Sequence, residues 1–368
     1  MGQALPIPTF GLSLNFEARV DLGQTSETAY REGLEFAAEA ARLGVETIWL
    51  PEHHGEQSGY IPSPIVGAAA IAAVTKTCRI GTAIALSPLY GHPLRLAEDF
   101  VVVDNLSGGR LDIGLGQGYR PHEYEALGLD YKRRTRAFEE GLEVLELAWT
   151  GERFDYDGQI YQTRGGILRP LPIRPGRPPL WIGATAPAAR ARVVRHRAGL
   201  ALNPLADLES TARHIAAFDR EAAAAGLQPL PKAISREILI GDSAQDALRR
   251  HKDGLDFMYR VQYSPERTGM TYVDPATGQR APLTADNPHY LSQAYVQERW
   301  WLGSPDEVAD SIVEWQHRLK LDVIRFNPRY PGLSVKDGLA EVELMMTKVA
   351  PRVRERLARI NEEAAKSG

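Results

Sequence analysis

Three strand-like stretches between Leu50 and Gly118 decide the fold: LPEHH at residues 50–54, which closes an apolar run, RIGTAIAL at 79–86 and LDIGLGQG at 111–118. Polar or glycine residues end each stretch or, like Ser87, directly follow it, and a helical pattern separates each stretch from the next. Such alternation is typical of an α/β protein in which strands give rigidity and the loops after them carry the chemistry.

The same alternation extends outward in both directions. Strands are expected at 10–16, 45–51, 79–86, 111–116, 179–183, 198–203, 234–240 and 321–326. Helical patterns follow them at 26–43, 62–74, 94–106, 133–149, 186–197, 208–225, from 244, from 304 and at 340–364. Ser26 is the expected cap of the first helix, and Ser304 with Glu307 three residues later predicts a capping box. Eight strand–helix units predict a parallel α/β fold, a (β/α)8 TIM barrel, as one domain over residues 1–368. A doubly wound dinucleotide fold is disfavoured because no Gly-x-Gly-x-x-Gly follows the first strand.

Two segments depart from this rhythm. Residues 154–169 carry Asp157-Gly158 between two short strand-like runs, which predicts a surface β-hairpin. Residues 256–300, near the seventh and eighth units, lack a clear period and are rich in Pro, Gly and Tyr. A stretch of this length is usually disordered or a functional lid, and its tyrosines favour an ordered lid or insertion.

Composition excludes several classes of protein. The 368 residues are 43% hydrophobic and 24% charged with a net charge of −4, so nucleic-acid binding is not expected. The single cysteine, Cys78, excludes an intrachain disulfide and a multi-thiolate metal site, and a buried inert thiol is expected. With neither a leader pattern nor an 18-residue apolar run, no membrane association and a cytoplasmic location are expected.

Glu52-His53-His54 is the densest group of ionisable residues at a strand end. Neighbouring strand residues point to opposite faces, so the two histidines are not expected to bind one metal ion. Without a His-Glu-x-x-His motif, a metal-dependent hydrolase is disfavoured and no metal site is expected. One histidine acting as an acid, base or hydrogen-bond donor is the functional interpretation. A histidine simply satisfied by nearby backbone is the alternative.

Small residues mark two further strand ends. Gly114–Gly118 would let backbone approach a ligand closely, although tight local geometry explains the glycines equally well. Gly183–Pro187 joins a strand to a helix start, where backbone N–H groups and the helix dipole suit a phosphate. Small residues and a cap also begin helices with no ligand present.

Taken together, LPEHH at 50–54, GTAI at 81–84, SGGRLDIG at 107–114 and WIGAT at 181–185 resemble the bacterial luciferase-like flavin-dependent monooxygenases. The resemblance runs from about residue 10 to 199 and resumes at residues 301–305. It implies a (β/α)8 barrel that binds FMN as FMNH2, supplied by a separate flavin reductase. O2 would then form a flavin C4a-(hydro)peroxide that oxygenates a small organic substrate, and the protein would be a homodimer.

The resemblance also implies roles for individual residues. His53 corresponds to the active-site histidine of the family, with His54 supporting it, and a non-proline cis peptide is expected at Ala83–Ile84. The implied phosphate site is Gly183, Ala184 and Thr185. The full set of implied cofactor contacts is Asn15, Thr82, Ala83, Ile84, Gly116, Gln117, Tyr119, Gly183, Ala184 and Thr185. Two positions depart from the luciferase α-chains: Gly116 replaces a reactive cysteine, and Gln117 replaces an arginine.

Three functions therefore stand side by side. The first is the two-component FMNH2-dependent monooxygenase. The second is an F420-dependent hydride-transfer oxidoreductase of the same fold, and the third is a flavin-binding relative without catalysis. The sequence specifies neither the substrate nor the choice between hydroxylation and Baeyer–Villiger insertion.

Overall fold

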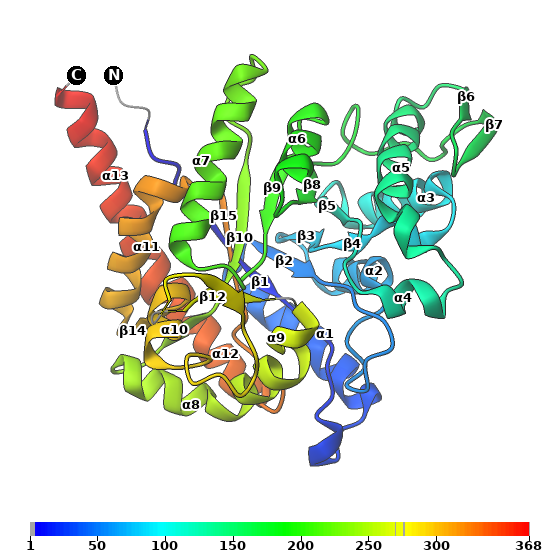
Figure 1. Cartoon of the computed structure of the whole chain (residues 1–368). Coiled ribbons are helices and arrows are strands. Elements are labelled where there is room, and N and C mark those ends of the chain that lie inside the picture. The colour runs from blue at the N-terminus through cyan, green and yellow to red at the C-terminus, as the bar shows by residue number, and fades with distance from the viewer. Residues whose placement is uncertain (1–3, 269, 275–276, 368) are drawn as a thin grey trace. The chain divides into compact units, whose positions relative to one another are not determined.

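The computed structural model describes residues 4–268, 270–274 and 277–367, which form two compact units. The N-terminal unit comprises residues 11–202 and 227–231, and the C-terminal unit comprises the remaining described residues. Each unit is built from parallel strands covered by helices, as Figure 1 shows.

Six parallel strands form the frame of the N-terminal unit. Each pairs with the next, and nearly every residue in them is buried, as expected of strands covered on both faces. They are β1 (Thr9–Ser13, in this unit from Gly11), β2 (Thr47–Leu50), β3 (Arg79–Thr82), β5 (Leu111–Gly116), β8 (Leu180–Gly183) and β9 (Gly199–Leu202).

The third expected strand is interrupted. Instead of one strand over 79–86, the chain forms β3 and a short β4 (Ala85–Leu86), and the peptide bond between Ala83 and Ile84 is cis. The expected cis peptide is therefore confirmed. β3 pairs with both β2 and β5, whereas β4 pairs with β5 alone, so the break stays within the sheet.

Helices follow the strands of this unit closely. They are α1 (Ser26–Arg42), α2 (Pro64–Val74), α3 (Pro93–Ser107), α4 (Pro121–Ala126), α5 (Arg134–Trp149) and α6 (Pro187–Arg195), with short 3-10 turns at Val20–Leu22, Ser87–Tyr90 and Tyr131–Arg133. The predicted hairpin at 154–169 is confirmed as β6 (Phe154–Asp157) and β7 (Gln162–Gly166), an antiparallel pair.

Two parallel strands, β10 (Lys232–Arg236) and β15 (Val323–Phe326), pair in the C-terminal unit, with Ala233 opposite Val323. The expected seventh strand at 234–240 is wrong as one element, because β11 (Ile238–Ile240) leaves β10 and pairs with β14 (Trp301–Gly303). The helices of this unit are α7 (Leu208–Ala224), α8 (Ala244–Phe257), α9 (Pro265–Thr268), α10 (Gln293–Arg299), α11 (Pro305–Leu319), α12 (Val335–Leu344) and α13 (Ala350–Ser367), with π-helical turns at Met258–Gln262 and Met345–Val349. No helix in the described residues is long and apolar enough to span a membrane.

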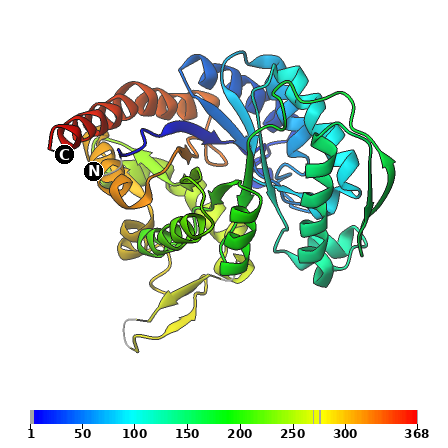
Figure 2. The same cartoon turned by 90° about the horizontal axis from the view of Figure 1, so that it is seen from above.

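The described residues of the insertion at 256–300 form short helices, strands and a packed cluster; residues 269, 275 and 276 lie outside the described part. Tyr259, Tyr290 and Tyr295 are buried in one cluster with Trp300. The antiparallel pair β12 (Thr271–Val273) and β13 (Arg280–Pro282) projects from this unit in Figure 2. Aromatic packing therefore anchors the insertion at both of its ends.

Candidate active site

His53 lies just beyond β2 and is held by a carboxylate from a different element. Its Nδ1 is 2.9 Å from Oε1 of Glu123, which also accepts the backbone N–H of His54 at 3.1 Å. His53 is buried and Glu123 is fully buried. Because a carboxylate only accepts, the contact places the ring proton on Nδ1 and leaves Nε2 for another partner.

The environment of the pair keeps the histidine neutral and the acid ionised. Burial lowers the pKa of His53 below its usual range, more than the hydrogen bond to Glu123 raises it. Burial acts to raise the pKa of Glu123, but the hydrogen bonds from His53 and the His54 backbone outweigh it, so that pKa is lowered. A neutral imidazole anchored by a carboxylate is suited to accept or deliver a proton through Nε2.

His54 belongs to a separate pair, with Glu52. His54 Nε2 is 2.8 Å from Glu52 Oε1, and this hydrogen bond raises the pKa of His54. The other oxygen of Glu52 accepts the Leu86 backbone N–H and the Tyr90 hydroxyl, both at 2.8 Å. His54 and Glu52 therefore tie the end of β2 to β4, which is a supporting role.

Glu123 was not among the residues predicted from the sequence. It sits in α4, a six-residue helix that follows the glycine-rich end of β5. The signal that could have found it is the proline at Pro121, which marks a helix start, with an acidic residue in the first turn. The helix is too short for its apolar residues to show a helical period.

A second set of buried polar and charged side chains lies beside the His53–Glu123 pair. Arg120 Nη1 is 2.5 Å from Glu56 Oε1, and Ser58 donates to Glu17 Oε1 at 2.9 Å. The predicted residue Asn15 donates to Glu17 Oε2 at 3.0 Å. The Asn15 side chain is thus engaged with protein beyond the end of β1, and burial raises the pKa of Glu17 to about 7.

The side chain of Ile84 explains the glycines of two neighbouring strand ends. A Cβ added to Gly116 would overlap Ile84 Cδ1, and one added to Gly183 would lie 2.6 Å from the same atom. A Cβ on Gly114 would overlap the carbonyl oxygen of Thr82. Close internal packing, the alternative left open for the glycine-rich run, thus accounts for Gly114 and Gly116.

Thr82, another predicted cofactor contact, is occupied by the sheet. Its hydroxyl donates to the Gly114 carbonyl at 2.6 Å and accepts the Gly114 N–H at 2.9 Å, and the residue is fully buried. Its neighbour Ala83 donates its N–H to the Leu50 carbonyl at 2.6 Å. The ends of β2 and β3 are thereby joined directly below the loop that carries His53.

The segment 183–187 fits a phosphate group. It leads into α6, whose first turn receives no hydrogen bond from an N-cap side chain, since the N-cap residue is Ala186. Ala184 is buried, whereas Thr185 is exposed. Ala186 and Pro187 are also exposed, and a helix start without a side-chain cap suits an anion, so these residues fit the phosphate of a flavin.

Gln117 and Tyr119, the remaining predicted cofactor contacts, follow the end of β5. Gln117 Oε1 is buried without a hydrogen-bond donor among the described residues, which suits a ligand N–H. The Tyr119 ring is half exposed and lies edge-on to His53, with ring centroids 5.8 Å apart. Tyr60 covers the His53 ring from a second direction at 5.1 Å.

Metal binding, Cys78 and His92 have less support as functional features. No group of three metal-ligating side chains occurs within residues 4–268, 270–274 and 277–367. Cys78 is buried, as expected, and burial raises the pKa of its thiol. His92 caps α3 through Nδ1, which accepts the Leu94 N–H.

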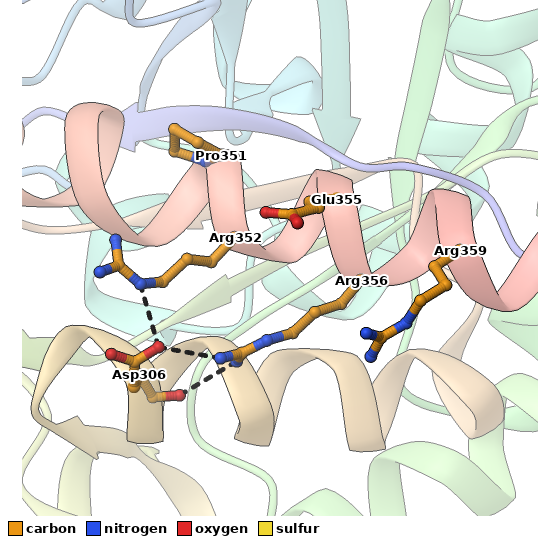
Figure 3. Close-up of a pocket in the computed structure, with 6 residues that line it drawn as sticks. All are labelled: Asp306, Pro351, Arg352, Glu355, Arg356 and Arg359. Atoms are coloured by element: carbon orange, nitrogen blue, oxygen red, sulfur yellow. Dashed lines mark hydrogen bonds and ion pairs between the residues drawn. The ribbon is translucent and has the colours of Figure 1, made fainter.

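A surface pocket of about 430 Å³ between α11 and α13 contains none of the predicted site residues. Figure 3 shows Arg352 and Arg356 reaching from α13 to Asp306 of α11. Their guanidinium nitrogens lie 3.0 and 2.8 Å from Asp306 Oδ1. Because their charges are already paired with Asp306, this pocket has the chemistry of a helix–helix contact.

Comparison with known proteins identifies the family. The profile of the family described as Luciferase-like monooxygenase matches residues 9–320. An uncharacterised protein, y4vJ, of Sinorhizobium fredii is 26% identical over 91% of this chain and 95% of its own length.

Relatives with named activities match over shorter stretches. The oxygenase component of the flavin-dependent trigonelline monooxygenase of Acinetobacter baylyi is 31% identical over 53% of this chain and 54% of its own. The F420-dependent glucose-6-phosphate dehydrogenase of Nocardia farcinica is 27% identical over 48% of this chain and 52% of its own. The chain thus matches about half the length of these two oxidoreductases.

Solved structures share the fold. Monooxygenase RslO1 from Streptomyces bottropensis superposes with a TM-score of 0.81 at 22% identity, covering 93% of this chain and 99% of its own. The oxygenating constituent of 3,6-diketocamphane monooxygenase from Pseudomonas putida, in complex with FMN, has a TM-score of 0.76 at 18% identity, covering 95% and 99%. The expected luciferase-like (β/α)8 barrel is confirmed, and the chain belongs to the luciferase-like monooxygenase family.

Proposed function

We propose that this protein is the oxygenase of a two-component, FMNH2-dependent monooxygenase acting on a small organic substrate. One oxygen atom of O2 would enter the substrate and the other would leave as water, with two electrons taken from FMNH2. The observation that supports this most is the neutral His53, anchored by Glu123 at the end of β2.

Different residues of the chain would carry out proton transfer, flavin binding and exclusion of water. His53 would move a proton through Nε2, while Glu123 holds the ring orientation. The start of α6 would bind the flavin phosphate, and Ile84, wedged against Gly116 and Gly183, would form an apolar floor. Bound FMNH2 would supply the O2 chemistry, and the apolar strand ends would exclude water from it.

The proposal includes further components. A separate flavin reductase would deliver FMNH2, and the active protein would be a cytoplasmic homodimer. Exposed apolar side chains on α2 and α3, namely Val66, Val74, Val102 and Leu106, support association with a second copy.

A mutation tests the role of His53. We expect His53→Ala to bind FMNH2 as the wild type does and to lose at least about 100-fold in coupled oxygenation, the usual contribution of a proton-transferring side chain. Binding is measured by anaerobic fluorescence titration, and coupling by oxygenated product formed per O2 consumed. His122→Ala, an exposed histidine of α4, is the control. Unchanged coupled turnover in His53→Ala would remove His53 from the mechanism.

An F420-dependent hydride transfer is the second candidate, favoured by the F420-dependent relative from Nocardia farcinica. Separate anaerobic titrations with FMNH2 and with reduced F420, followed by admission of air, distinguish the two. Binding of FMNH2 with a transient flavin absorbance change after air supports the monooxygenase. Binding of F420 alone, with no O2 consumed, would establish the second candidate instead.

A further inference from the structure

Arg120 stands at the centre of the charged groups around His53. Its guanidinium is 2.5 Å from Glu56 and 4.0 Å from Oε1 of Glu123, the oxygen that holds His53. It is 2% exposed, and its Cζ lies 5.6 Å from the centroid of the Tyr119 ring. A buried cation between two carboxylates interacts strongly with both, because water screens little there.

The loop that carries His53 is closed around the same cation. The His53 N–H approaches the Ile61 carbonyl at 3.4 Å, and Glu56 lies between these ends. Ser58, two residues after Glu56, donates its hydroxyl to Glu17, and its carbonyl accepts the Ala18 N–H at 2.8 Å. Arg120 therefore joins the loop after β2 to the start of α4.

We propose that Arg120 is a positioning residue for His53: from its place between Glu56 and Glu123, its charge keeps the imidazole neutral while Glu123 holds Nδ1, so that Nε2 is the nitrogen left for the reaction. Glu56 acts as the opposing charge that fixes Arg120 in place. The effect of Arg120 on catalysis rests on the proposed function, whereas its effect on the charge of His53 does not.

The charged groups that face His53 shift its pKa in opposite directions. From α4 and its N-cap these groups are Glu123 and Arg120, and from the loop after β2 the group is Glu56. Arg120 lowers the pKa of His53, whereas the Glu123 and Glu56 carboxylates raise it. The tyrosines 60 and 119 contact the ring, and Glu17 faces Arg120 and Glu56 from the end of β1.

This opposition separates an electrostatic role from a structural one. Arg120→Gln and Glu56→Gln break the same ion pair, so a merely structural contact would loosen the loop alike in both variants. An electrostatic role predicts opposite effects on His53. Its titration should move to higher pH in Arg120→Gln, which removes a cation, and to lower pH in Glu56→Gln, which removes an anion.

The measurement is an NMR titration of the His53 ring in full-length protein labelled with 13C-histidine, without added cofactor. The signal is assigned by its absence in His53→Gln. Arg120→Lys, which keeps the charge but loses the planar fork, should titrate close to the wild type. Thermal melting of each variant confirms that it is folded.

Opposite displacements in the two variants support the proposal. Displacements in the same direction, or none in either, would overturn it. If Arg120→Gln does not fold, Glu56→Gln with Arg120→Lys decides: a lower His53 titration in the first and an unchanged one in the second support the proposal, and any other pair of results contradicts it. Since neither flavin nor substrate is added, the outcome is independent of whether the monooxygenase assignment holds.

Discussion

The side chain of Ile84 leaves little room for a Cβ at two glycines of the strand ends. Its Cδ1 occupies the space that a Cβ would take at Gly116 and at Gly183. Attractive contacts between carbon atoms need a separation of roughly 3.5–4.0 Å, so an added methyl group must displace either the isoleucine or the backbone. Ile84 and Gly183 are partly exposed, so the overlap at Gly183 involves only the end of the isoleucine side chain. Gly116 is buried, and a Cβ added there would also lie 3.1 Å from Ile84 Cγ1, so relief at Gly116 is harder.

Gly116→Ala should therefore destabilise the protein by about 1–3 kcal/mol, the usual cost of overpacking a core. Ile84→Val removes Cδ1 and should cost about 0.5–1.5 kcal/mol alone, but should recover stability in the Gly116→Ala background. Urea unfolding of both single variants and the double variant gives the coupling free energy.

Gly141 offers the matched control, since it lies inside α5 and an added Cβ would come no closer than 3.4 Å to an atom outside the helix, the Ser87 hydroxyl oxygen. Alanine there should be neutral or stabilising by up to about 1 kcal/mol, because alanine favours helix. Additive effects of Gly116→Ala and Ile84→Val would show that the two residues are not in contact.

For single residues of the site, the sequence indicated His53 but not the residues that set its orientation and charge. His53 follows an apolar strand, and a histidine at that position carries its own chemical signal. Glu123 and Arg120 are about 70 residues further along the chain, in and before a helix of one and a half turns. Only the pairing of β2, β3 and β5 brings them to His53, and no local pattern encodes that approach.

Among the elements, the insertion at 256–300 is held in place by a buried carboxylate. Glu237, between β10 and β11, accepts the Tyr259 hydroxyl at 3.0 Å and also the Tyr330 hydroxyl. Tyr290 in turn donates to the Tyr259 carbonyl at 2.6 Å. Tyr259 and Tyr290 belong to the insertion, so these contacts fasten it to the strands of the C-terminal unit.

Tyr259→Phe should loosen this segment by about 1–3 kcal/mol, because a buried carboxylate loses one of its donors. Hydrogen exchange is expected to accelerate in peptides covering 258–263 and 287–296, with little change in β15. Tyr156→Phe removes a similar hydroxyl–Glu143 contact at the surface and serves as the control. Equal exchange in Tyr259→Phe and the wild type would contradict an anchoring role for the hydroxyl.

How far an element could be predicted depended on its length and periodicity. β5 is observed over residues 111–116, as expected, and α11 begins with the capping box expected from Ser304 and Glu307. The expected Ser26 cap of α1 is wrong, since Thr25 accepts the Thr28 N–H. Two hydroxyl residues in succession both satisfy the capping preference, and only the backbone geometry selects between them.

For the whole molecule, the alternation of strands and helices carried enough information to predict the (β/α)8 class. Eight separate units each add a weak signal, and errors of a few residues at their ends leave the order intact. The sequence pattern could not reveal the network of Glu17, Glu56 and Arg120. Its members come from three loops, and their charges are paired only once those loops are closed.

The same network makes global stability depend on pH. Burial raises the pKa of Glu17 from 4.5 to about 7 in the folded protein, whereas the unfolded chain keeps the ordinary value. Between these two values the native state binds more protons than the unfolded state, so the free energy of unfolding falls as pH rises through this window. Below it both states are protonated and above it both are ionised, so the contribution is constant at either end.

Glu17→Gln removes this titration. From pH 4 to pH 8, the wild type should lose about 3 kcal/mol of stability relative to Glu17→Gln, which follows from 1.36 kcal/mol for each pKa unit. Urea unfolding of both proteins at each pH measures the difference, and Glu27→Gln, an exposed residue of α1, controls for a surface charge. A difference that stays constant over this range would mean that Glu17 is ionised at its ordinary pKa, and that the surrounding donors fully offset its burial.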